Sequence, residues 1–156
     1  MLEQDKFTIR AAMRTDATAI HDLHTASVMA LCTACYPLDL VNDWISNRTP
    51  EGYYKGIDRG EMFVCECRDM IVGFGHAVRG EVVAIFVHPD WVHQGVGSLL
   101  LSHGIERAKH SHEGSIKLIA TLNAQPFYEK HGFSEVKRYS VKRNEVDIPV
   151  VEMEHF

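Results

Sequence analysis

Two glycines follow a run of apolar residues at a spacing that suits the start of a helix. Gly95 and Gly97 come after the apolar stretch 82–87, and beyond them apolar residues recur at spacings near three and four, at Leu99, Leu100, Leu101, Ile105 and Ala108. The first turn of a helix offers unpaired backbone N–H groups and the positive end of the helix dipole, which suit a phosphate or pyrophosphate. The segment Val92–Ser98 is therefore a candidate anion site. The alternative is that the glycines only permit a tight turn.

A second group of polar residues follows the next predicted strand. Asn123 stands at the carboxyl end of the strand 116–122, and Tyr128 comes just over one helical turn later. Ligands of open α/β sheets gather at the carboxyl ends of strands, so an amide and a phenol at this place can contact a ligand. Considered one at a time, Asn123 is also explained as a helix cap and Tyr128 as an amphipathic surface tyrosine.

Four cysteines occur as two close pairs, Cys32 with Cys35 and Cys65 with Cys67. Four thiolates could bind zinc, but the first pair falls in a predicted helix and the second straddles one strand residue, which is unlike the usual zinc knuckle. Free thiols are the preferred interpretation, and we predict no metal site.

The elements that must position these residues alternate between strands and helices. Period-two and period-3.6 patterns predict strands over 7–10, 62–66, 71–78, 81–87, 116–122, 133–141 and 149–153, and helices over about 16–30, 38–45, 50–60, 96–108 and 124–130. The first helix has Thr15 or Asp16 as its expected N-cap. The strand 81–87 is apolar on both faces, so it is predicted to lie centrally and to be covered on both sides. Strand, helix, strand and helix from 81 to 130 predict a parallel crossover.

Composition sets the class of protein. The 156 residues have a formal net charge of −5, with 46% apolar and 24% charged residues, which predicts one globular domain over 1–156 and argues against a nucleic-acid partner. The longest apolar stretch, 82–87, is far shorter than a membrane span requires. Residues 1–6 lack the apolar core of a secretory signal, so we expect a cytoplasmic location and reduced thiols.

The chain resembles the GNAT superfamily of acyl-CoA-dependent N-acetyltransferases at four places, which together cover nearly its whole length. The segment from Val87-His88-Pro89-Asp90-Trp91 to Gly95-Val96-Gly97-Ser98-Leu99-Leu100 resembles the pyrophosphate motif, and Asn123-Ala124 through Phe127-Tyr128 to Gly132-Phe133 resembles the later motif. Ile9-Arg10-Ala11 with Asp16-Ala17, and Ile71-Val72-Gly73-Phe74, are similar to the first and third strands. The resemblance implies a mixed α/β (α+β) fold with a mostly antiparallel sheet of six or seven strands, a parallel central pair and about four helices.

The same resemblance implies acetyl-CoA as cosubstrate. Backbone donors at Gln94, Gly95, Val96, Gly97 and Ser98 would hold the pyrophosphate, aided by the Gln94 side chain or a protonated His93. Val92 and His93 depart from the family pattern, which opens with Gln or Arg and often Gly, and this departure bears on coenzyme affinity. Asn123 and Tyr128 would lie beside the pantetheine arm.

Direct acyl transfer from the thioester to a primary amine is the implied reaction. Because an amine of lysine type is mostly protonated at neutral pH, a base is required, and Glu81 is the first candidate with His76 in reserve. A solvated strand-end charge and a structural histidine are the alternatives for these two. A backbone N–H at the Phe86–Val87 end of the strand would stabilise the oxyanion, and Tyr128 would protonate the leaving thiolate.

The acceptor is expected to be a small-molecule or peptide amine. The segment 27–60 and the hairpin would line its pocket, with Tyr36, Trp44, Tyr53 and Tyr54 as aromatic surface. The sequence does not separate a polyamine, an amino acid, an antibiotic and a protein N-terminus. A homodimer through the sheet edge or terminal strands is compatible with the resemblance. Two other functions stay open: an acyl-CoA-binding regulatory module with little or no turnover, and a thiolate-metal interaction protein.

Overall fold

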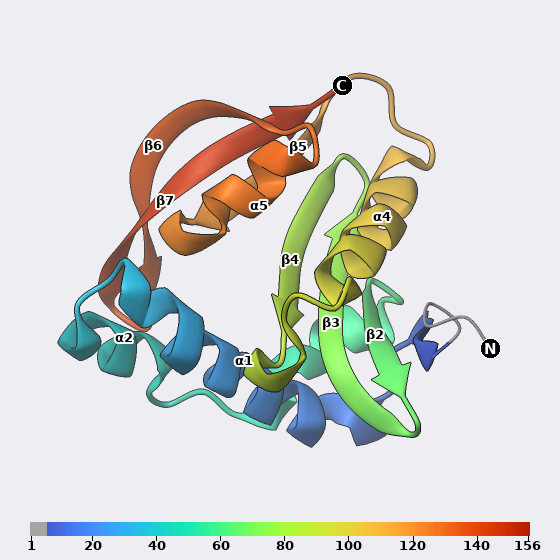
Figure 1. Cartoon of the computed structure of the whole chain (residues 1–156), viewed down its shortest axis with the longest axis horizontal. Helices are drawn as coiled ribbons and strands as arrows, with labels where there is room; N and C mark the ends of the chain where they lie inside the picture. Colours follow the sequence, from blue (N-terminus) through green and yellow to red (C-terminus); the bar gives the residue numbers. More distant parts are fainter. Residues whose placement is uncertain (1–5) are drawn as a thin grey trace.

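Seven strands of the chain form one sheet in a computed structural model that describes residues 6–156. The order across the sheet is β1-β2-β3-β4-β5-β7-β6. The strands are β1 (Thr8–Ala11), β2 (Met62–Cys67), β3 (Met70–Val78), β4 (Glu81–Val87), β5 (Ile116–Thr121), β6 (Ser134–Arg143) and β7 (Val146–His155). Only β4 and β5 run parallel, as the predicted crossover requires, and the other neighbours are antiparallel (Figure 1). Residues 1–5, on which the prediction of location partly rests, lie outside the described residues.

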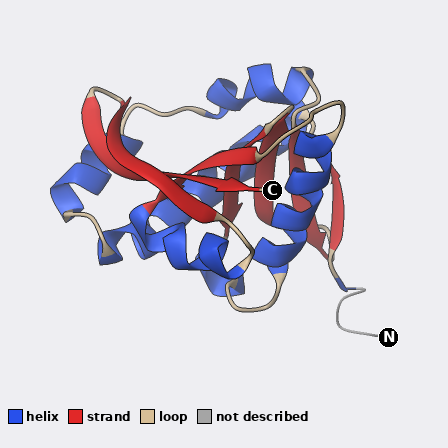
Figure 2. Cartoon of the chain, turned by 90° about the horizontal axis from the view of Figure 1, so that it is seen from above, coloured by secondary structure: helices blue, strands red, loops and turns tan. Residues whose placement is uncertain are grey.

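Helices cover both faces of this sheet (Figure 2). Five α-helices occur within residues 6–156, as the sequence patterns predict, whereas the resemblance implied about four: α1 (Ala17–Leu31), α2 (Leu38–Ile45), α3 (Tyr54–Asp58), α4 (Val96–Lys109) and α5 (Gln125–Lys130). Along β2, Val64 packs in the same cluster as α1, whereas Phe63 and Cys65 pack in that of α4. Alternate residues of a strand point to opposite faces, so α1 and α4 lie on opposite sides of the sheet. The described residues contain no helix with the length and apolarity needed to cross a bilayer.

The predicted cap of α1 has a different role. Asp16 directly precedes the helix but makes no capping hydrogen bond to it. Its carboxylate instead accepts hydrogen bonds from the Arg10 guanidinium at 2.8 and 2.9 Å and from the Met13 N–H at 2.8 Å. Charge-assisted hydrogen bonds are stronger than neutral ones, so the carboxylate pairs with Arg10 and does not cap α1. These bonds lower the pKa of Asp16.

Strand β4 is central, as predicted, and its two faces pack against α1 and α4, but most of its residues are only partly buried. Only Val82 is fully buried, and Val83 is 39% exposed. The cause is its pairing with β5, which is limited to Glu81 with Lys117 and Val82 with Leu118. Beyond Val82 the two parallel strands separate, and the rest of β4 borders an open cleft.

Candidate active site

The cleft beside β4 has a volume of about 1090 Å³. Its walls come from β4, the end of β5, the first turn of α4, the helix α5, and the side of α1 and α2. Most of the residues selected from sequence line it: Phe86, Val87, Val92, His93, Gly95, Gly97, Ser98, Asn123 and Tyr128. Gln94, Val96 and Glu81 do not.

The start of α4 presents free backbone donors. Gly95 is the N-cap residue at φ +88°, in the left-handed region, and it has no side chain with which to cap the helix. The Leu99 N–H donates to the Gly95 carbonyl at 3.1 Å, so the N–H groups of the three residues between them have no partner within the helix. These donors belong to Val96, Gly97 and Ser98 and point to where an anion would sit.

The loop before α4 differs from the sequence expectation in two details. His93 adopts φ +64°, a conformation that glycine takes without strain and that costs other residues of the order of 1 kcal/mol or more. Gln94 does not line the cleft; it lines a smaller groove on the other side of the loop, which His93, Gly95 and Ser98 also border. Val96 is buried, and what it offers to a ligand is its backbone N–H.

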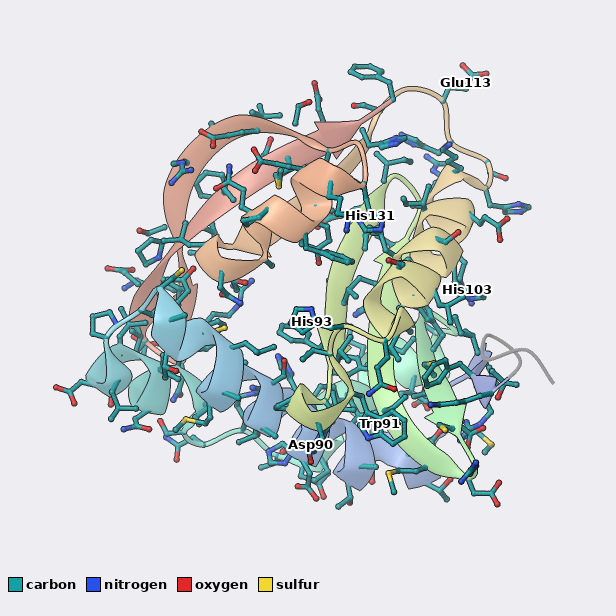
Figure 3. All side chains as sticks on the ribbon, in the orientation of Figure 1. Asp90, Trp91, His93, His103, Glu113 and His131 are labelled. Atoms are coloured by element: carbon teal, nitrogen blue, oxygen red, sulfur yellow. The ribbon has the colours of Figure 1, made fainter. Side chains whose placement is uncertain are left out.

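Helix α5 closes against the first turn of α4. The hydroxyl of Ser98 lies 2.9 Å from Nε2 of His131, whose Nδ1 is 2.9 Å from the Phe127 carbonyl. A Cβ added to Gly97 would approach the Phe127 ring at 3.2 Å, so glycine permits this close packing. Both His93 and His131 line the cleft; Figure 3 shows His93 on the loop before α4 and His131 between the end of α5 and α4.

Two polar groups of the later motif lack partners at the cleft. Asn123 lies in a short 3₁₀ turn and does not cap α5, whose N-cap residue is Ala124; its Oδ1 is buried with no hydrogen-bond partner among residues 6–156. Tyr128 is buried, and burial raises the pKa of its phenol. The phenol therefore stays protonated at neutral pH. Buried polar atoms normally have partners, so Asn123 Oδ1 points to a ligand donor in the cleft.

Strand β4 aims a backbone donor into the cleft. The His88 N–H donates to the Val72 carbonyl, and Phe86 pairs with Phe74 on the same neighbouring strand. Because successive N–H groups of a strand point to opposite edges, the Val87 N–H points away from β3, toward the side from which β5 has separated. Of the two residues considered for the oxyanion donor, the geometry favours Val87.

Neither base candidate is brought to this place. Glu81 and Phe86 are five residues apart on β4, which corresponds to roughly 16 Å along an extended strand. His76 lies on β3 with its Nε2 2.9 Å from Oε1 of Glu61 and does not line the cleft. Neither side chain therefore lines the cleft that the Val87 donor and Tyr128 border.

The acceptor side contains residues that the sequence analysis missed. His24 and Arg48 line the cleft, and the His24 ring lies 4.1 Å from the Phe86 ring, centroid to centroid. One feature of the sequence could have revealed His24: it is a polar residue that follows Ile20 by one helical turn, on the otherwise apolar stripe of α1. Arg48 lies in an irregular segment after α2, where no periodic pattern marks it.

The four aromatic residues predicted for the acceptor pocket lie in different parts of the structure. Trp44 lines the cleft. Tyr53 does not line the cleft, but its hydroxyl lies 2.8 Å from Nδ1 of His24, which does. Tyr36 is a core residue whose hydroxyl accepts from the Leu122 N–H at 3.0 Å and donates to the Pro149 carbonyl. Tyr54 stacks against Arg14, with 4.4 Å from Cζ to the ring centroid, and does not line the cleft.

The cysteine pairs lie in different parts of the core. Cys32 packs in the cluster around α2 and β7, whereas Cys65 and Cys67 pack between the sheet and α4. Burial raises the pKa of the Cys32 thiol to about 12 and that of Cys65 to about 11. No three metal-ligating side chains gather in the part of the chain that the structure describes.

The sequence matches an acetyltransferase family model and one curated relative. A family model described as an acetyltransferase (GNAT) domain matches residues 58–135, half of the chain. The uncharacterized N-acetyltransferase YafP of Escherichia coli (strain K12) is 29% identical over 84 residues, which are 54% of this chain and 53% of that protein. The match therefore spans about half the length of this curated relative.

Two solved structures share the fold along almost the whole chain. A GCN5-related N-acetyltransferase from Rhodopseudomonas palustris has a TM-score of 0.87 at 22% identity, covering 95% of this chain and 94% of that one. The PaiA N-acetyltransferase from Thermoplasma acidophilum, solved in complex with coenzyme A, has a TM-score of 0.74 at 18% identity, covering 96% and 98%. The mixed α/β fold with its parallel pair, predicted from sequence, is confirmed by these likenesses.

Proposed function

The chain belongs to the GNAT acetyltransferase family, and on this premise we propose that it transfers an acetyl group from acetyl-CoA to a primary amine. One observation carries the proposal: uncapped amides of α4, the unpartnered Asn123 Oδ1 and the Tyr128 phenol border a single cleft. We further propose that residues 1–156 form one catalytic domain that works in the cytoplasm, with a homodimer as the assembly to test.

The cleft has groups that fit the coenzyme. When bound, acetyl-CoA would supply an activated acyl thioester. The N–H groups of Val96, Gly97 and Ser98 would hold its diphosphate, because they are free donors at the positive end of a 14-residue helix. Asn123 Oδ1 would accept a hydrogen bond from an amide N–H of the pantetheine arm. His93, at the mouth of this region, would add a positive charge when protonated.

The Val87 N–H and the Tyr128 phenol would act on different atoms of the thioester. The Val87 N–H would stabilise the negative charge that develops on the acetyl oxygen as the amine attacks. Tyr128 would donate its proton to the departing sulfur, and a proton lost by the attacking nitrogen would restore the phenol. A phenol with a raised pKa is a weaker acid than a thiol, so its hydrogen bond to the sulfur contributes alongside the proton transfer.

The amine must be neutral when it attacks. Glu81 and His76 do not line the cleft, so we propose that water in the cleft takes the proton. The cationic side chains Arg48, Lys130 and Arg143 line the cleft, and no Asp or Glu among residues 6–156 does so. Positive charge nearby lowers the pKa of an amine, which raises the fraction of neutral nucleophile.

Thiol release tests the proposal. Purified protein with acetyl-CoA is expected to free coenzyme thiol in the presence of at least one class of primary amine, and calorimetry is expected to show acetyl-CoA binding. Binding without thiol release across a broad amine panel would favour the regulatory module instead. No binding of acetyl-CoA would contradict both functions.

A further inference from the structure

Arg48 is a cation without an anionic partner. It lines the cleft on the acceptor side, and no carboxylate of residues 6–156 lies within 4.0 Å of its guanidinium. Its Nη1 is buried and makes no hydrogen bond to the described residues. A buried donor on a charged group that lacks a partner is costly, so this nitrogen points to a group that the chain itself does not supply.

Two neutral side chains fix the other nitrogen of this guanidinium. Nη2 of Arg48 contacts both Nδ1 of His24 and the Tyr53 hydroxyl. Since an arginine only donates, Nδ1 of His24 must be the unprotonated nitrogen of a neutral ring. Burial first, and then the charges of Arg48 and His21, lower the pKa of His24 and keep this ring neutral. Neither neighbour neutralises the arginine.

This arrangement also rules His24 out as the missing base. The ring nitrogen that could take a proton is occupied by Arg48 and Tyr53, and the other nitrogen of a neutral ring carries its own proton. His24 is therefore a positioning residue: its ring packs against Phe86, and its Nδ1 holds the Arg48 guanidinium, which lines the same cleft.

The charged side chains among the described residues that line the cleft are all positive. Arg143, on the turn side of β6, and Lys130, at the end of α5, also border the cleft, and none of the lining residues is acidic. A polyamine would bring positive charge into a positive cleft. An acceptor with an anionic group would instead neutralise a partly buried cation that has no anionic partner among residues 6–156.

We propose that the amine acceptor also carries a carboxylate, which the Arg48 guanidinium binds, as in an amino acid. The inference rests on the proposed acetyl transfer and names the substrate class of the same site. A carboxylate fits better than a phosphate. Nη2 already contacts His24 and Tyr53, so only part of the guanidinium's set of N–H donors is available to a ligand. The two oxygens of a carboxylate are enough to accept hydrogen bonds from the donors that remain.

Matched amines test the inference with the wild-type protein. Each set contains an amino acid, its primary amide and the amine that lacks the carboxyl group, with one aminophosphonate added. We expect kcat/KM to be higher for the amino acid than for its amide by a factor on the order of 10 to 100, as one charged hydrogen-bond pair gives. Equal or faster acetylation of the amide or the simple amine would overturn the inference, and so would preference for the aminophosphonate.

Variants locate the effect. Arg48→Gln is expected to remove the preference for the carboxylate, so that within this variant kcat/KM is about the same for the amino acid and for its amide, and Arg48→Lys is expected to retain part of the preference. Arg79→Gln removes an exposed arginine at the β3–β4 turn and serves as the matched control. Calorimetry with coenzyme A present gives a readout without turnover, because the N-acetylated amino acid should bind the wild type at least tenfold more tightly than Arg48→Gln.

Binding measurements with acetyl-CoA alone distinguish failure of this inference from failure of the proposed function. Affinity for acetyl-CoA alone should be the same in wild type and Arg48→Gln, and a loss there would assign Arg48 to the coenzyme and overturn the inference. Absence of acetyl-CoA binding in the wild type would reject the proposed function itself. Thermal unfolding of both Arg48 variants verifies their folding, and the wild-type panel decides the question if they are unstable.

Discussion

Ser98 Oγ lies 2.9 Å from His131 Nε2, so the first turn of α4 is tied to the end of α5 across one side of the cleft. Ser98 supplies one of the uncapped N–H groups of α4, and His131 follows the helix that carries Tyr128. The contact joins the proposed diphosphate site to the proposed acid catalyst.

Loss of this contact should loosen coenzyme binding. In Ser98→Ala the backbone N–H remains but its helix is no longer tied to α5, so we expect a two- to fivefold rise in the Kd for acetyl-CoA, equivalent to about 0.5–1 kcal/mol. Ser102→Ala, on the next turn of α4, is the control. Calorimetric titration measures both, and an unchanged Kd for Ser98→Ala would show that the tie does not support the site.

Asn123→Ala should affect stability and binding in opposite directions. Its Oδ1 is buried without a partner, and removal of such an atom relieves an unpaired polar group. The free energy of unfolding without coenzyme should therefore stay equal or rise, while the Kd for acetyl-CoA should increase about five- to tenfold. Thermal unfolding with and without acetyl-CoA measures both effects. A large loss of stability without ligand would mean that Asn123 is structural.

Tyr128→Phe should lower kcat with little change in stability. The ring stays in its cluster with Phe133 and Val151, and the lost hydroxyl has no hydrogen-bond partner among residues 6–156. We expect kcat to fall on the order of 100-fold, as for loss of a general acid, with Kd for acetyl-CoA nearly unchanged. Glu81→Gln, assayed beside it for thiol release, should retain most of the activity. The reverse ranking would restore Glu81 as the base and remove Tyr128 from the mechanism.

Stability should fall between pH 7 and pH 5 because of His24. Burial lowers the pKa of His24 in the folded protein, so below about 6.5 the unfolded chain binds a proton that the folded chain does not. Stability therefore rises with pH through this window, by at most about 1.4 kcal/mol per pH unit for one proton. Denaturant unfolding of wild type and His24→Gln tests this, and the variant should have the shallower slope. His103→Gln should also reduce the slope, because burial lowers the pKa of His103 in the same direction.

One cysteine should react much faster than the others. Cys35 is exposed, whereas Cys32, Cys65 and Cys67 are buried. Alkylation of the native protein at pH 8 should modify one thiol rapidly, and Cys35→Ser should remove this phase. The thiolate-metal alternative predicts a different result: a chelator would increase the number of reactive thiols, and untagged protein would contain stoichiometric zinc.

The amino-acid sequence by itself determined the order and type of the elements and the start of α4. Period-two runs such as β4, the apolar spacing after Gly97 and the left-handed position at Gly95 are local properties, which depend on residues a few places apart. Tertiary structure decided the site. Where β4 separates from β5 depends on pairing between distant segments, and that separation exposes β4, aims the Val87 N–H into the cleft and leaves Glu81 at the far end. Arg48 meets His24 only because the segment after α2 folds back on α1, and no pattern within either segment encodes that contact.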